Sequence, residues 1–137
     1  MRDSTTRKTI LIVAGLVATV IGAWSLFDPD AFRRANGIDL SGSISLLSEA
    51  RAAGGGLMTT GILIMLGAFI ARLTFTAALV GAAVYLSYGV ARLLSLALDG
   101  RPAGNLMWAT AAELLLGIAC VFALVRYRGD KTQARRH

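Results

Sequence analysis

The chain has 137 residues, of which 55% are hydrophobic and 16% are charged, and its formal net charge is +6. A soluble domain of this size carries roughly a quarter charged residues, so the composition indicates one integral membrane domain and excludes a disordered chain or a disulfide-stapled scaffold. The single cysteine, Cys120, cannot form an internal disulfide, and the only histidine is the last residue, His137. We therefore predict no metal site and no cofactor.

Four apolar stretches predict membrane spans at about 10–27, 52–71, 73–98 and 104–125. A helix needs about 20 apolar residues to cross the hydrocarbon core, and every backbone amide in lipid needs an internal partner, so the stretches must be helices. The predicted fold is all-α: a four-helix transmembrane bundle with antiparallel up-down topology, which forms a single domain over residues 1–137.

The first stretch follows Arg7 and Lys8, as the apolar region of a signal peptide would. Its apolar run is longer than such regions, and Asp28-Pro29 follows it in place of a small-residue cleavage site. We therefore expect a retained helix.

The long connection after the first span carries helix-end signals. Asp28 fits an N-cap and Pro29 a first helical position, and Asn36-Gly37 fits a left-handed C-cap. We predict a short helix at about 29–35 at the outer interface, with Phe32 facing lipid. The segment from Ser41 to Arg51 is expected to start the second helix outside the hydrocarbon; the alternative is a solvated loop.

The other two connections are short. Arg72 and its neighbours alone join the second and third spans, and Asp99-Gly100-Arg101-Pro102-Ala103 forms a turn between the third and fourth.

The basic residues predict the orientation. With four spans, both chain ends lie on one side, and nine of the 14 basic residues lie there: Arg2, Arg7, Lys8, Arg72, Arg126, Arg128, Lys131, Arg135 and Arg136. Only four lie on the opposite side. Because basic residues flank cytoplasmic span ends, we expect both termini, with basic tails at 1–8 and 126–137, to be cytoplasmic. We attribute the net positive charge to the membrane topology and to attraction for anionic lipid headgroups. We therefore predict no nucleic-acid partner.

Two charged residues lie inside predicted spans and require an explanation. A charge there costs about 2.5–3.5 kcal/mol on insertion scales. Arg92 lies roughly 10 Å in from Asp99, and Glu113 lies roughly 12 Å in from Asn105, at 1.5 Å per residue. The two share a depth across the last hairpin, so we predict that they form an ion pair.

Further polar residues extend this centre at helical spacing. The candidate binding residues are Glu49, Arg51, Tyr85, Tyr88, Arg92, Asp99 and Glu113. Three interpretations stay open: the groups only fix helix register, they line a cavity that faces the outer leaflet, or they catalyse a reaction. No nucleophile–base pair or second acid accompanies Glu113, so we assign no catalytic residue.

Three sequence elements carry a family resemblance: Pro29…Gly37…Glu49-Ala50-Arg51-Ala52-Ala53-Gly54-Gly55, Ala91-Arg92…Asp99-Gly100-Arg101-Pro102 and Glu113-Leu114-Leu115-Leu116-Gly117. Over roughly residues 9–125 the chain resembles a family of small bacterial four-helix membrane proteins catalogued as domain of unknown function 4345. The resemblance implies a four-helix architecture and the bacterial cytoplasmic (inner) membrane, and it marks the charged residues. It implies no established activity.

Three functions are compatible with the sequence. The first is a non-enzymatic binding or accessory protein that contacts membrane lipids and holds a lipophilic small molecule or docks on a larger membrane complex. The second is an enzyme acting on a lipid or isoprenoid-like substrate, with Glu113 as acid or base. The third is a small proton-coupled exporter. It ranks last because exporters of that kind have little difference in basic residues between the two membrane sides, whereas this chain has a clear one. A homo-oligomer is compatible with each.

Overall fold

A computed structural model describes residues 2–40, 42–102 and 104–134. Five residues that enter the predictions above lie outside the described residues: Ser41, Ala103, Arg135, Arg136 and His137. Within the described part the chain forms five helices and no strand: α1 (Arg2–Phe27), α2 (Pro29–Ala35), α3 (Ile44–Leu66), α4 (Thr74–Asp99) and α5 (Gly104–Ala134). Among the described residues, three segments are long and apolar enough to cross a membrane: Ser4–Phe27, Thr74–Asp99 and Gly104–Gly129. The chain is therefore an all-helical membrane protein.

The break between α1 and α2 follows the local sequence. The Asp28 carboxylate accepts a hydrogen bond from the Ala31 amide at 3.1 Å, and Pro29 occupies the first turn of α2. Gly37, just after α2, has a φ of 75°, which an L side chain rarely adopts. The short helix at 29–35 is confirmed. The Phe32 ring packs edge-to-face on Trp24 with centroids 5.3 Å apart, and its contact with lipid stays a prediction.

Helix α3 begins where the sequence predicts and ends earlier than expected. Ser43 caps its first turn by accepting from the Leu46 amide at 3.3 Å. The helix stops at Leu66 rather than near residue 71, because the start of α4 folds back against Gly67. The Thr74 hydroxyl donates to the Gly67 carbonyl at 2.8 Å, and a Cβ at Gly67 would collide with Ala77. The connection between α3 and α4 is thus longer than the predicted turn at Arg72.

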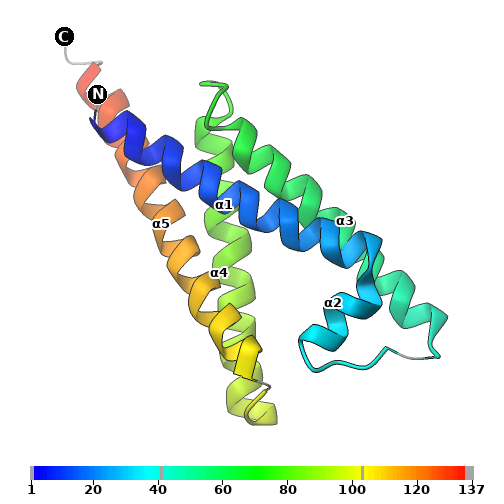
Figure 1. Ribbon diagram of the computed structural model, residues 1–137. Helices are drawn as coiled ribbons and strands as arrows, with labels where there is room; N and C mark the ends of the chain where they lie inside the picture. Colours follow the sequence, from blue (N-terminus) through cyan, green and yellow to red (C-terminus); the bar gives the residue numbers. More distant parts are fainter. Residues whose placement is uncertain (1, 41, 103, 135–137) are drawn as a thin grey trace.

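Helices α1 and α3 lie side by side (Figure 1) and touch through glycines. A Cβ at Gly15 would lie 2.6 Å from the Met65 amide nitrogen, and a Cβ at Gly54 would lie 2.8 Å from the Gly22 carbonyl oxygen. Gly61 makes the same close approach to α1. The residue numbers at the contacts rise along α1 while they fall along α3, so the two helices are antiparallel. Small residues permit such backbone contact, which drives helix association in lipid.

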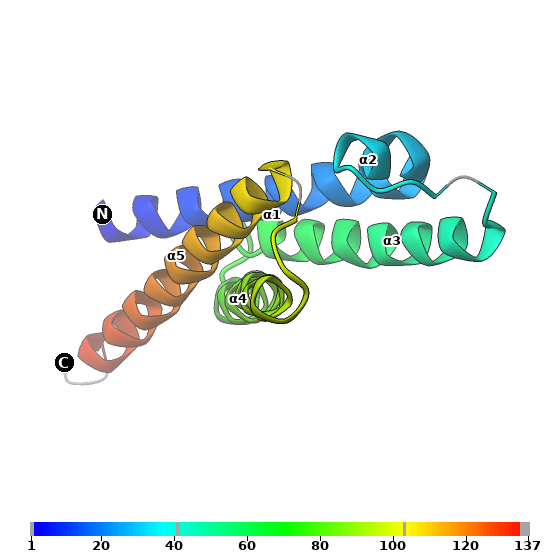
Figure 2. The ribbon, with the colours of Figure 1, turned by 90° about the horizontal axis from the view of Figure 1, so that it is seen from below.

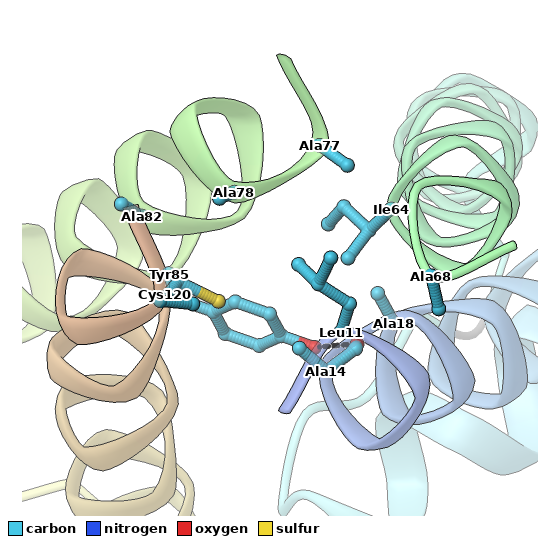
Figure 3. Packing of buried hydrophobic residues seen from close by; sticks show 11 residues of the cluster. Leu11, Ala14, Ala18, Ile64, Ala68, Ala77, Ala78, Ala82, Tyr85 and Cys120 are labelled. Carbon is cyan, nitrogen blue, oxygen red and sulfur yellow. Dashed lines mark hydrogen bonds between the residues drawn. The ribbon is translucent and has the colours of Figure 1, made fainter. Parts of the chain in front are cut away.

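The second pair, α4 and α5, meets the first at an angle. Figure 2 views α4 nearly end-on while α1 and α3 run across the picture. The shared core between the pairs consists mainly of alanines: Leu11, Ala14, Ala18, Ile64, Ala68, Ala77, Ala78, Ala82, Tyr85, Cys120 and Ala123 (Figure 3). Cys120 is fully buried there, beneath Gly81. The two pairs diverge from this core, and α2 lies on the side where their ribbons are far apart (Figure 1).

Candidate functional site

A cavity of about 150 Å³ lies where all five helices contribute side chains. Its lining residues are Val17, Ala18, Ile21, Ser25, Phe32, Arg33, Ala53, Gly54, Leu57, Val84, Tyr85, Tyr88, Arg92, Ala109, Ala112, Glu113 and Leu116. The wall is mostly apolar, with a few polar groups, which is the usual make-up of a small-molecule site. Helix α2 covers one side and is joined to the start of α5, because the Asn105 amide donates to the Ala35 carbonyl.

Arg92 on α4 and Glu113 on α5 face each other in this cavity. Arg92 Nε donates to Glu113 Oε2 at 2.8 Å, and the two side chains are 33% and 16% exposed. Leu114 packs against Gly89 in this region, so α4 and α5 approach closely enough for the side chains to meet. A charge-assisted hydrogen bond of this length is among the stronger polar contacts in proteins.

The two tyrosines lie one and two turns before Arg92 along α4 and have different surroundings. The Tyr85 hydroxyl donates to the Ala14 carbonyl on α1 at 2.5 Å, so it links the two helix pairs (Figure 3). Its ring is 5% exposed, whereas that of Tyr88 is 42% exposed. Both rings line the cavity. Tyr85 therefore holds this part of the cavity wall in place, whereas Tyr88 is the more exposed of the two tyrosines that line the cavity.

The other three predicted site residues lie outside the cavity lining. Arg51 instead closes the end of α1: its Nη1 donates to the Leu26 carbonyl at 2.6 Å, which satisfies a group that a helix end leaves free. Asp99 accepts from the Ser95 hydroxyl at 2.9 Å in the last turn of α4. Glu49 is exposed on α3. The expected grouping of Arg51 with the Arg92–Glu113 centre is thus absent.

Arg33 is a cavity residue that the sequence analysis did not single out. Its Nε is buried and has no hydrogen-bond partner among the described residues, and its guanidinium lies 5.9 Å from the Phe32 ring centroid. The neighbouring Arg34 pairs with Asp30 at 2.7 Å. The sequence could have indicated that Arg34 is paired and Arg33 is not. Arg34 has an acidic residue four positions earlier on the helix, whereas Arg33 has Pro29 at that spacing.

The charges around the cavity do not balance. Two guanidinium groups and one carboxylate line it, so its formal charge is +1. The Glu113 carboxylate is engaged by Arg92, and the described residues contain no group of three or more His, Cys, Asp or Glu side chains that would hold a metal ion. The arrangement can accept an anionic or hydrogen-bonding group between apolar walls, and it lacks an unengaged acid or base for proton transfer.

One of three comparisons with known proteins found a match. No curated protein and no solved structure matches the chain. A family model described as a domain of unknown function (DUF4345) matches residues 6–124, a range that includes every residue lining the cavity. The chain therefore belongs to the DUF4345 family.

Proposed function

We propose that this is a non-enzymatic binding protein of the bacterial cytoplasmic membrane, in which the cavity holds a lipophilic small molecule near the outer leaflet. In this proposal four helices cross the membrane: α1, α3, α4 and α5. The long glycine contact between α1 and α3 supports including α3, because packing of that kind is typical of helices in lipid. The excess of basic residues near both chain ends supports cytoplasmic termini, and α2 then lies at the outer interface.

The observation that carries this proposal is the cavity with the Arg92–Glu113 pair in its wall. A charged residue within a span is expensive and is commonly a functional residue. The pair here lies in a cavity with mostly apolar walls. The Glu113 carboxylate already accepts a hydrogen bond from the Arg92 guanidinium at 2.8 Å, and this engagement favours binding over catalysis.

The test compares two substitutions on the same helix. Ala112 lines the cavity, whereas its neighbour Ala111 does not. We expect Ala112→Phe to fill the cavity and abolish saturable binding of 1-dodecanol, an uncharged probe, to the full-length protein in phosphatidylcholine nanodiscs. Ala111→Phe serves as the control and should bind as the parent does. Native mass spectrometry and a direct titration measure the bound probe. Equal binding by both variants, or no saturable binding by the parent, would refute the proposed function.

A further inference from the structure

The Nε atom of Arg33 is the least satisfied polar atom of the cavity wall. Burying a polar atom without a hydrogen bond costs free energy, and the cost is larger when the group carries a charge. Arg33 Nε is buried and has no partner among the described residues. Its position on α2 brings a positive charge to the cavity from a different helix than the Arg92–Glu113 pair. A ligand that supplied an acceptor at this point would remove the penalty.

The neighbouring acids are engaged elsewhere. Asp28 caps α2 through the Ala31 amide, Asp30 pairs with Arg34, and Glu113 pairs with Arg92. The single positive charge that remains on the cavity wall is therefore that of Arg33. An anion fits this position, and a cation does not.

The size and walls of the cavity restrict the anion further. A cavity of about 150 Å³ can hold a small headgroup and is too small for a whole lipid. Much of the remaining lining is aliphatic, including Val17, Ile21 and Leu57, and part of this lining reaches the surface, since Ile21 is 38% exposed. An apolar tail can leave the cavity along this surface.

We propose that the cavity binds the carboxylate or phosphate headgroup of an anionic amphiphile, and that Arg33 recognises its charge. The proposal rests on the proposed binding function and names the chemical class of the ligand. The headgroup accepts hydrogen bonds from the Arg33 guanidinium, its far side is within the reach of Tyr88, and its tail runs between the helices into the bilayer. Guanidinium groups suit this role because they bind both carboxylates and phosphates through two parallel hydrogen bonds.

The experiment uses the full chain in phosphatidylcholine nanodiscs. Trp24 reports on the site, because its ring contacts Phe32 beside Arg33, and a Trp108→Phe background leaves it as the only tryptophan. The probes are dodecanoate, dodecyl phosphate, uncharged 1-dodecanol and inorganic phosphate. We expect the two anionic amphiphiles to change Trp24 emission saturably and more tightly than dodecanol does. Arg33→Gln should weaken their binding at least about tenfold, which corresponds to about 1.4 kcal/mol.

Arg34→Gln is the matched control, since it removes the same charge from the adjacent position but outside the cavity. It should bind the anionic probes as the parent does, and Arg33→Lys should recover part of the lost affinity. Neither Gln variant should alter dodecanol binding. An equal loss in both Gln variants would overturn the proposal, because it would indicate a general surface charge effect. Binding of inorganic phosphate as tight as that of dodecyl phosphate would overturn the amphiphile assignment.

The outcomes also separate this proposal from the function on which it rests. If dodecanol and dodecanoate bind equally well, and Arg33→Gln changes neither, the anion proposal is wrong while the cavity remains a lipophile site. If no probe binds saturably, both fail. Circular dichroism and thermal unfolding of each variant establish that it is folded before its binding is compared.

Discussion

The contact between α1 and α3 predicts a large difference between two alanine substitutions two residues apart. A Cβ at Gly54 would lie 2.6 Å from the Leu26 amide nitrogen and 2.8 Å from the Gly22 carbonyl oxygen. Both neighbours are backbone atoms, so they cannot rotate away. A Cβ at Gly56 meets nothing within 4 Å. Gly54→Ala and Gly56→Ala therefore make the same chemical change in the same helix with opposite steric consequences.

The magnitude follows from the required displacement. The two helices must move roughly 0.8 Å apart to restore ordinary van der Waals contact at Gly54, and a gap of that size forfeits a quarter to a half of the local dispersion energy. Overpacking of this kind costs about 1–3 kcal/mol. Replacing glycine by alanine inside a helix gains up to about 1 kcal/mol of helix propensity. That gain applies to both variants, so their difference isolates the steric cost.

We expect Gly54→Ala to unfold more easily than Gly56→Ala by about 1–3 kcal/mol, and Gly56→Ala to be at least as stable as the parent. Reversible unfolding of the full chain in bicelles, followed by circular dichroism with increasing denaturant, gives the free energies. Gly22→Ala provides a check from the other helix, because its Cβ would meet the Gly54 carbonyl. Equal stabilities of Gly54→Ala and Gly56→Ala would refute the backbone contact and with it the pairing of α1 and α3.

Three further predictions concern polar contacts, measured by the same unfolding assay. Tyr85→Phe removes the hydrogen bond to the Ala14 carbonyl and should lower the free energy of unfolding by about 1 kcal/mol; no change would mean that the bond contributes nothing. Arg92→Gln and Glu113→Gln should each cost about 1–3 kcal/mol, because each strands a partly buried partner. The double variant should lose less than the sum of the two, and strict additivity would argue against the pair. Arg51→Met should cost about 1 kcal/mol by leaving the α1 terminus uncapped, and full stability would contradict that role.

Features that depend on neighbouring residues could be predicted from the sequence. The start of α2 could be predicted from a carboxylate directly before a proline, and its end from a glycine, which can adopt a positive φ. The approach of Arg92 to Glu113 could also be predicted, because a short turn between two helices fixes which residues lie at equal depth. In both cases the geometry is set by the helix rise and by a connection of few residues.

Features that depend on contacts between distant segments could not be predicted. Arg51 and Arg33 both lie on the same side of the predicted bundle, and nothing in their local sequence ranks Arg51 below Arg33 as a cavity residue. Arg51 donates its hydrogen bond to a carbonyl at the end of α1, because the close glycine contact brings α3 alongside that terminus. Arg33 reaches the cavity because α2 folds back over it. The early end of α3 has the same origin, since it results from the return of α4 onto Gly67.

The glycine contact and the cavity are parts of one structural arrangement. Gly54 takes part in the closest approach of α1 to α3 and also lines the cavity, and Ser25 on α1 lines it and donates to the Ala50 carbonyl on α3 at 3.1 Å. The width of the cavity on this side is therefore fixed by backbone contact, which cannot adjust by rotating a side chain. On the other side, α2 contacts its neighbours through side chains, including the hydrogen bond from Asn105 and the Trp24–Phe32 ring contact. The glycine side of the cavity therefore cannot widen without separating α1 from α3, whereas on the α2 side the wall is made of side chains that can rotate.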